Sequence, residues 1–238
     1  MNVLAVIPAR AGSQRVHNKN LKKLGGKTLV QLAYECAELS GIFSEIVVST
    51  NDPSIAGGLP FVQRPDAICG PTADISDAVS HAMEAVETEK NMQFDYVVTL
   101  QPAIPIRKPG LIQSLLNRVI SNNCGGGVTG VEVVPWLWSA EDGHASNGWY
   151  PKPYPRSQEF ANKSLWQEIN SVQVASRAAV LNGDRWRLPL AIELLPPFAV
   201  LDIDTPADFE LAERVYDQLI DAYSKDTHYR GFVVHKIN

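Results

Sequence analysis

Short, nearly all-apolar runs alternate with amphipathic helical patterns, and this order restricts the possible fold more than any other feature of the chain. Three runs are typical of strands buried on both faces, as in a parallel sheet: Asn2–Pro8, Glu45–Thr50 and Asp95–Gln101. Three stretches have helical spacing of apolar residues: Thr28–Ser40, Ile75–Glu89 and Gly110–Ser121. The order predicts an α/β fold with a doubly wound, mostly parallel sheet.

Polar residues follow each of the three predicted strands. Arg10–Asn20 follow the first strand, Asn51 and Asp52 the second, and Gln101–Arg107 the third. In doubly wound folds, ligands bind beyond the carboxyl ends of the parallel strands. We therefore expect these segments to meet at one edge of the sheet and to form the functional site.

The regular pattern stops at Pro135. The stretch 135–170 contains four prolines and four of the five tryptophans. Disordered segments lack aromatic residues, so the tryptophans predict an ordered arm. The sheet is expected to resume near Ser171–Ala175 and Phe198–Ile203, and a last helix is expected at Pro206–Tyr223. We therefore expect one domain over 1–238, with a small aromatic-rich arm at about 135–170.

The charge distribution points to an anion site near the beginning of the chain. The net charge of −5 gives no indication of a nucleic-acid or membrane partner. The first 34 residues nevertheless contain no Asp or Glu, although they carry several cations: Arg10, Arg15, Lys19, Lys22, Lys23 and Lys27. A solvated basic surface would normally have acidic residues interspersed, so this segment favours a bound anion.

The cysteines and the first residues predict a cytoplasmic protein. The three cysteines, Cys36, Cys69 and Cys124, are odd in number and far apart in the sequence, which fits neither a disulfide framework nor a zinc site. The apolar run Val3–Ile7 is too short for a signal peptide or a membrane span.

The segment Pro8–Asn20 has the composition of a phosphate-binding loop. It follows a predicted buried strand, and Gly12 and Ser13 permit close approach of backbone N–H groups to phosphate oxygens. Two arginines and a lysine supply fixed positive charge. The segment has neither the glycine and lysine spacing of ATPase phosphate loops nor the glycine spacing of dinucleotide-binding loops.

Asp202 and Asp204 form a candidate Mg²⁺ site. They stand two residues apart in Val200–Thr205, a predicted strand, so both carboxylates are expected on one face. Mg²⁺ prefers a few carboxylates together with oxygens of a phosphate substrate. The alternative is an edge strand that leads into a helix cap, with Asp204 or Thr205 starting the helix at Pro206.

The segment Ile7–Leu29, IPARAGSQRVHNKNLKKLGGKTL, closely resembles the opening signature of the acylneuraminate cytidylyltransferase family, which makes CMP-activated nonulosonic acids. Further matches to the family's motifs lie in Val47–Ala56, Gln63–Pro65, Leu100–Arg107, Pro155–Gln158, Ile169–Ser171 and Val200–Thr205. The resemblance implies a Rossmann-like nucleotidyltransferase layer fold and a homodimer whose arm reaches the partner's site. It also implies CTP and an acidic 2-keto-3-deoxy sugar as substrates, with Mg²⁺ as cofactor.

The residues and the resemblance together predict the role of each site residue. The expected catalytic groups are Arg10, Lys19 and Arg156. The expected nucleotide contacts are Ala9, Arg10, Gly12, Ser13, Arg15, Asn20, Arg64, Asp74 and Ser76. The expected sugar contacts are Gln101, Arg156 and Asn170, and the expected metal ligands are Asp202 and Asp204.

Several positions depart from the family pattern. Gln14 stands where the family often has Lys, Ala103 and Ile104 replace Thr-Ser, and Ser171 replaces Gly. The family also has a stretch whose hydroxyl groups face the nucleotide base, and it corresponds to residues 71–76 here. Thr72 is a further candidate for that contact, beside Asp74 and Ser76. Three alternatives therefore remain open: an octulosonate cytidylyltransferase, a metal-dependent glycosyltransferase, and a non-catalytic nucleotide-binding relative.

Overall fold

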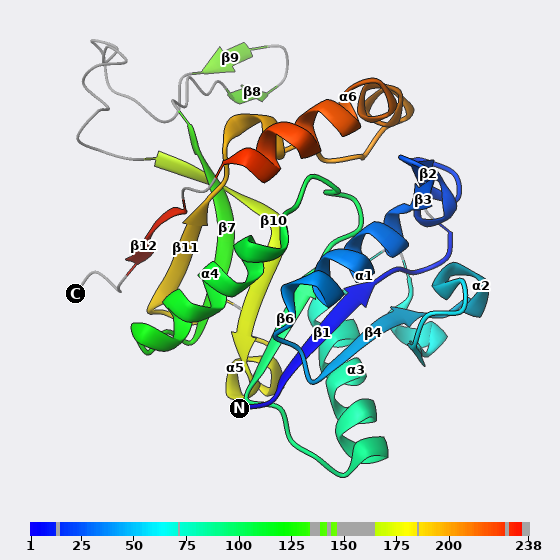
Figure 1. Cartoon of the computed structure of the whole chain (residues 1–238), viewed down its shortest axis with the longest axis vertical. Helices are drawn as coiled ribbons and strands as arrows, with labels where there is room; N and C mark the ends of the chain where they lie inside the picture. The colour runs from blue at the N-terminus through cyan, green and yellow to red at the C-terminus, as the bar shows by residue number, and fades with distance from the viewer. Residues whose placement is uncertain are drawn as a thin grey trace.

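A computed structural model describes residues 1–12, 15–70, 72–133, 139–141, 144–146, 165–184, 186–226 and 229–234 of the chain, with the backbone alone for 139–141, 144–146 and 165. Its centre is an eight-stranded sheet (Figure 1). In spatial order the strands are β12 (Arg230–Val234), β11 (Leu190–Leu194), β7 (Gly126–Val133), β10 (Leu165–Ser176), β6 (Tyr96–Leu100), β1 (Val3–Pro8), β4 (Glu45–Thr50) and β5 (Phe61–Gln63). Only β10 and β12 run against the others within this sheet, so the predicted doubly wound, mostly parallel fold is confirmed.

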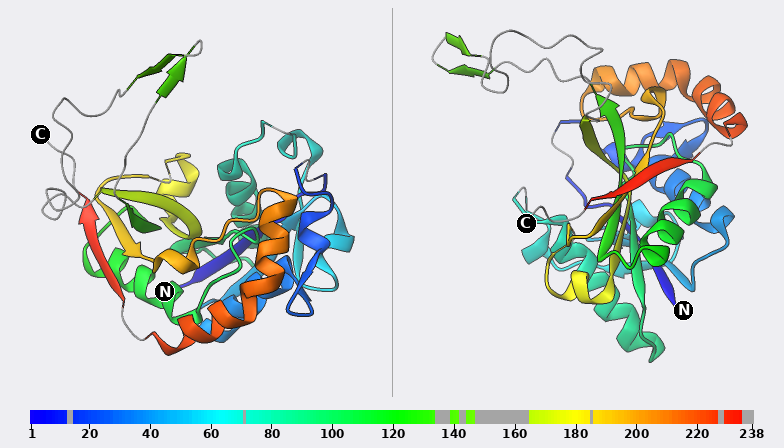
Figure 2. Two further views of the ribbon diagram at one scale, coloured as in Figure 1. Left: turned by 90° about the horizontal axis from the view of Figure 1, so that it is seen from above. Right: turned by 90° about the vertical axis from the view of Figure 1, so that its left-hand side faces the viewer.

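The sheet is covered by helices on both faces (Figure 2). On one face lie α1 (Leu29–Ser40), α4 (Pro109–Ser121) and α6 (Pro206–Lys225), and on the other lie α3 (Ile75–Lys90) and α5 (Arg177–Leu181). The apolar side chains of alternate strand residues fill both layers, which is why the strand sequences are almost continuously apolar. Leu4 and Val6 of β1, for example, pack toward α3, while Val3 and Ala5 pack toward α1.

Local sequence signals set the ends of the first helix. The Thr28 side chain accepts a hydrogen bond from the Gln31 backbone N–H, and the Gln31 side chain accepts one from the Thr28 N–H, which forms a capping box. The helix ends at Gly41, whose φ of 66° is easily adopted only by glycine. The predicted helices at 28–40, 75–89, 110–121 and 206–223 are all confirmed to within a few residues.

Short elements fill the connections at the carboxyl ends of β1 and β4. After β1 come the 3-10 turn η1 (Lys19–Leu21) and a small hairpin of β2 (Lys23–Leu24) and β3 (Lys27–Thr28). After β4 come α2 (Pro53–Ala56), β5 and the 3-10 turn η2 (Asp66–Ile68).

The strand predicted at Phe198–Ile203 is wrong. Pro197–Ala199 form the 3-10 turn η4, and residues 200–204 pair with no strand of the described chain. One backbone hydrogen bond, from the Ile203 N–H to the Ala103 carbonyl at 2.9 Å, attaches this segment to the loop after β6. The apolar and acidic alternation arises because Ile203 is buried while the flanking aspartates keep contact with solvent, and not because of sheet pairing.

The predicted arm lies mostly outside the described residues. Residues 165–170, which the prediction assigned to the arm, belong to β10 of the main sheet. Between β7 and β10 the backbone forms a two-stranded ribbon of β8 (Ser139–Glu141) and β9 (His144–Ser146).

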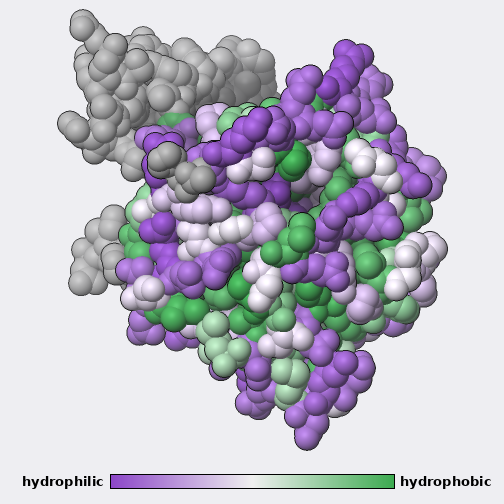
Figure 3. Space-filling view, in the orientation of Figure 1, coloured by the Kyte–Doolittle hydropathy of each residue, from purple (hydrophilic) through white to green (hydrophobic). Residues whose placement is uncertain are grey.

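Among the described residues, no helix is both long and apolar enough to cross a membrane. On the face shown in Figure 3, apolar residues are interspersed with hydrophilic ones.

Candidate active site

The loop after β1 is held in place by side chains from neighbouring segments. The Asn51 side chain, at the end of β4, accepts a hydrogen bond from the Ala11 backbone N–H at 2.9 Å. Buried Asn20 donates to the Arg10 carbonyl at 3.1 Å and so ties the end of the loop to its beginning. Gly12 has a φ of 74°, which explains glycine at this position. The described parts of the loop, residues 9–12 and 15–20, are thus tied to neighbouring segments and carry the backbone and cationic donors that a phosphate site requires.

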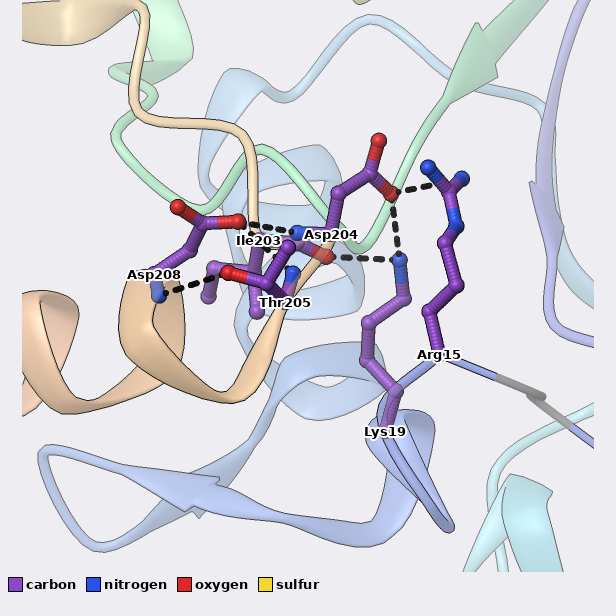
Figure 4. Close-up of polar contacts among 6 residues, drawn as sticks. All are labelled: Arg15, Lys19, Ile203, Asp204, Thr205 and Asp208. Carbon is purple, nitrogen blue, oxygen red and sulfur yellow. Dashed lines mark hydrogen bonds and ion pairs between the residues drawn. The ribbon is translucent and has the colours of Figure 1, made fainter.

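The first and last parts of the predicted site meet at Asp204 (Figure 4). The Arg15 guanidinium lies 3.0 Å from Asp204 Oδ1, and the Lys19 ammonium lies 3.4 Å from the same oxygen. The Lys19 Nζ also donates to the Ile203 carbonyl at 2.7 Å. Residues about 185 positions apart in sequence therefore share one cluster of charges.

The segment that carries the two aspartates is anchored by the start of α6. Thr205 is the N-cap residue and Pro206 the first helical residue, so the capping prediction is confirmed for Thr205. The Asp208 carboxylate accepts hydrogen bonds from the Thr205 and Asp204 backbone N–H groups at 2.7 and 3.0 Å. The pKa of Asp208 is lowered, first by a hydrogen bond with the Thr205 side chain and then by these two backbone bonds. The capping role and the site role therefore coexist, because Asp208 holds the backbone while the Asp204 side chain faces the loop cations.

The two candidate metal ligands interact electrostatically. The pKa of Asp202 is raised, first because the surrounding protein reduces its solvation and then because the Asp204 carboxylate repels its charge. The cations Lys19 and Arg15 act in the opposite direction on the same pKa. Although the predicted strand is wrong, the charge of the Asp204 carboxylate still acts on Asp202.

This donor set fits Mg²⁺. Among the described residues, no three or more His, Cys, Asp and Glu side chains gather into a complete metal site. Two hard carboxylates beside a cationic loop match an ion that takes its remaining ligands from water and phosphate oxygens. Asp202 and Asp204 are the residues that would hold it.

Arg64 contributes from inside the protein. Its side chain is buried and donates to Ser49 through Nε and Nη2, at 3.1 Å to the hydroxyl and 2.7 Å to the carbonyl. Burial lowers the pKa of Arg64, and the positive charge of nearby Arg10 acts in the same direction. Arg10 itself donates to the Cys69 carbonyl at 3.3 Å. The predicted Arg10 and Arg64 thus form a pair of cations beside the loop.

Other predicted nucleotide contacts lie at the start of α3 and directly after β1. Asp74 caps α3 by accepting from the Ser76 backbone N–H at 2.8 Å. Ala9 is buried directly after β1, and its N–H donates to the Ser49 carbonyl. Ser13 and Arg156 lie outside the described residues, so their predicted roles stay predictions.

Sequence reasoning assigned no role to Arg107, yet this residue joins the two segments that carry the predicted sugar contacts Gln101 and Asn170. Its guanidinium is buried and donates to the carbonyls of Ser171, Gln101 and Ile104 at 3.1, 2.8 and 3.1 Å. It thereby joins the loop after β6, which carries Gln101, to the part of β10 that carries Asn170. The Asn170 Oδ1 is buried and has no hydrogen-bond partner within the described chain. The sequence signal that could have revealed Arg107 is its position at the end of the Leu100–Arg107 motif.

Comparison with known proteins identifies the family. The cytidylyltransferase family model matches residues 4–134, which is more than half of the chain. This chain belongs to the cytidylyltransferase family. Its members are nucleotidyltransferases, and the matched region of this cytidylyltransferase contains the loop after β1, Arg64 and Gln101.

Two relatives match this cytidylyltransferase over nearly their whole length, and a third matches over about half of its length. A CMP-N,N'-diacetyllegionaminic acid synthase from Legionella pneumophila is 29% identical over 91% of this chain and 97% of its own length. A pseudaminic acid cytidylyltransferase from Campylobacter jejuni has the same identity and coverage. An 8-amino-3,8-dideoxy-manno-octulosonate cytidylyltransferase from a Shewanella strain is 32% identical, but over only 49% of this chain and 47% of its own.

Solved structures confirm the fold of the cytidylyltransferase. A CMP:2-keto-3-deoxy-manno-octonic acid synthetase complexed with CTP matches with a TM-score of 0.64 at 20% identity, over 92% of this chain and 99% of its own. A 4-diphosphocytidyl-2C-methyl-D-erythritol synthase matches with a TM-score of 0.63 at 17% identity, over 91% and 98%.

Proposed function

We propose that this cytidylyltransferase condenses CTP with an acidic 2-keto-3-deoxy sugar of the nonulosonate type, giving a CMP-sugar and pyrophosphate. The observation that carries the proposal is the meeting of Arg15 and Lys19 with Asp204 at the carboxyl end of β1. A cationic loop and a carboxylate pair side by side suit a magnesium triphosphate.

The extent of the matches favours a nonulosonate over an octulosonate. The two relatives named for legionaminic and pseudaminic acids match along nearly the whole of both chains. The octulosonate relative matches about half of each chain. The matches to the legionaminate and pseudaminate relatives extend over Asn170, Asp202 and Asp204, the proposed sugar and metal residues of the second half.

The residues of the chain have distinct proposed tasks. The backbone N–H groups around Gly12, with Arg10, Arg15 and Lys19, bind the triphosphate and offset the negative charge that develops on the departing pyrophosphate. Gln101 and Asn170 orient the sugar so that its anomeric oxygen attacks the α-phosphorus in line with the breaking bond to the β-phosphate. Mg²⁺, held by Asp202 and Asp204, would supply further neutralisation of phosphate charge. Arg156 is proposed to bind the sugar or the leaving group.

We further propose a cytoplasmic homodimer. The support is the family resemblance of the aromatic-rich stretch 135–170, most of which lies outside the described residues. Light scattering coupled to size exclusion tests the dimer, and a monomer at micromolar concentration would contradict it.

A pyrophosphate-release assay tests the proposed reaction. The purified chain is incubated with Mg²⁺, each of the four nucleoside triphosphates in turn, and a panel of nonulosonic and octulosonic acids. We expect release with CTP and a nonulosonic acid, and little release with ATP, GTP or UTP. Binding of CTP without pyrophosphate release across the whole panel would instead indicate a non-catalytic relative, which the departures at Gln14, Ala103 and Ile104 motivate.

A further inference from the structure

A small cavity lies on the α3 and α5 side of the sheet, between these helices and strands β6 and β10. The cavity has a volume of about 20 Å³, within a wider opening of about 310 Å³ that includes open solvent. It is lined by Ile75, Ser76, Val79, Thr99, Gln173, Ala175, Ala179, Val180 and Gly183. Such a space fits a group of a few heavy atoms and is too small for a whole sugar or nucleotide.

One polar side chain in this cavity lacks a partner. Gln173 is only 7% exposed, and its side-chain Nε2 has no hydrogen-bond partner in the part of the chain that the structure describes. Buried amide groups are almost always hydrogen-bonded, because an unpaired donor loses its water without compensation. The amide of Gln173 is therefore placed to donate to an acceptor that none of the described residues supplies.

The cavity adjoins the proposed substrate site. Gln173 pairs in register with Thr99, and the sugar candidate Gln101 follows Thr99 by two residues. Asn170 lies three residues before Gln173 on the same strand. On the opposite wall, Ser76 stands in the first turn of α3. Gln101 and Asn170 thus stand two and three residues along the chain from the Thr99–Gln173 pair, roughly 7–10 Å at the rise of a strand, and a substituent on a sugar held by them would have to span this distance.

We propose that this cavity is a subsite for a short acyl group on the sugar acid, and that Gln173 is the residue that selects for it. The acyl carbonyl oxygen accepts a hydrogen bond from the Gln173 Nε2, and the methyl end packs against the apolar side chains of Val79 and Val180. An acetyl group has three heavy atoms, which suits the size of the space. The inference rests on the proposed function, because the acyl group must belong to the sugar that is activated.

The test compares two sugar acids that differ only in one N-acetyl group, the second carrying the free amine. Pyrophosphate release with CTP gives kcat/KM for each sugar in the wild type, in Gln173→Leu and in Gln167→Leu. Gln167 is exposed on the same strand and outside the cavity, so it is the matched control. We expect Gln173→Leu to lower the preference for the acetylated sugar about tenfold, as for loss of one hydrogen bond. The KM for CTP should stay unchanged.

Thermal unfolding separates this role from a structural one. Because the amide has no partner among the described residues, the apolar and similarly sized leucine should leave the midpoint of Gln173→Leu equal to or above that of the wild type. A midpoint well below the wild type would show that Gln173 is a structural residue. As a second variant, Ala175→Val narrows the cavity without changing the amide, and it should raise the KM for the acetylated sugar several-fold more than that for the amine.

The outcomes distinguish this inference from the proposed function. If the wild type releases no pyrophosphate with any sugar acid, the proposed function itself fails and the subsite falls with it. If the wild type is active but Gln173→Leu and Ala175→Val keep the wild-type preference between the two sugars, the subsite alone is overturned.

Discussion

Arg10 is the residue for which geometry and expected chemistry coincide most directly. It is the second residue after β1, it lies beside the buried Arg64, and Asn20 fixes its backbone carbonyl. A guanidinium held this way can meet a phosphate with little reorganisation, which makes such donors effective in stabilising developing charge.

We expect Arg10→Ala to lower kcat/KM for CTP by about 100- to 1000-fold, the range seen when a preorganised donor to developing charge is removed. Pyrophosphate release at varied CTP concentration measures it. Lys23→Ala is the control, because Lys23 is an exposed cation of the same segment in the small hairpin, and it should stay within about twofold of the wild type. Near-full turnover of Arg10→Ala would reject the assignment.

Asp204 and Asp208 allow metal binding to be separated from helix capping. Asp204 faces Arg15 and Lys19, whereas Asp208 accepts hydrogen bonds from the backbone at the start of α6. Asp204→Asn should weaken CTP-dependent Mn²⁺ binding, measured by electron paramagnetic resonance, at least about tenfold, as for loss of a contact that matters to a metal site. Asp208→Asn should mainly lower the thermal midpoint. Equal Mn²⁺ affinity of Asp204→Asn and the wild type would exclude Asp204 as a ligand.

At the scale of elements, a paired Glu and Arg join two helices on one face of the sheet. Arg177 of α5 donates through Nε and Nη2 to the Glu87 carboxylate of α3, at 2.8 and 2.9 Å. The same carboxylate accepts from the Phe94 backbone N–H at 3.0 Å. The bond to Arg177 is the main reason that the pKa of Glu87 is lowered.

This pair predicts an acid-sensitive contribution to stability. Because the folded-state pKa of Glu87 lies below 4.5, the stabilisation is fully present above about pH 4.5 and is lost as the pH falls through the lowered pKa. Glu87→Gln should reduce the free energy of unfolding at pH 7 by about 1–2 kcal/mol, a value reduced for the partial exposure of Arg177. Urea unfolding at pH 7 and at pH 3 measures the difference between the two proteins. A difference that does not shrink at pH 3 would contradict the assignment.

The sequence predicted the elements whose local residue pattern is clear, and it missed those whose pattern depends on packing against residues far away in the chain. The strands β1, β4 and β6 are apolar on both faces, so their pattern is clear. The unpredicted β7 is rich in glycine because a side chain on Gly127 would come within 2.6 Å of Val119 Cγ2 in α4. Glycine weakens a strand signal, and only the tertiary packing explains why it is needed.

The site was predictable to the same extent. Arg10, Lys19 and the aspartate pair stand in recognisable local motifs, so the sequence could name them. The roles of Asn51, Arg107 and Gln173 depend on bonds, register or cavities formed with residues far away in the chain, which no local pattern encodes.

At the scale of the whole molecule, magnesium CTP would contact two segments that are far apart in the sequence. The loop after β1 and the segment before α6 contribute to the same charge cluster, and a backbone hydrogen bond attaches the second of these to the loop after β6. A ligand that contacts both segments binds only the folded chain, so its binding free energy adds to the free energy of unfolding.

Magnesium CTP should therefore raise the thermal midpoint of the whole domain. At a free concentration of about 100 times Kd the stabilisation is about 2.7 kcal/mol, or roughly 5–11 °C for a domain of this size. Differential scanning calorimetry with and without Mg²⁺ measures it, with magnesium ATP at the same concentration as the control. The part of the shift that requires Mg²⁺ should disappear in Asp204→Asn, because that carboxylate would link the metal to the segment before α6. An undiminished shift in that variant would mean that the triphosphate is held by the loop after β1 alone.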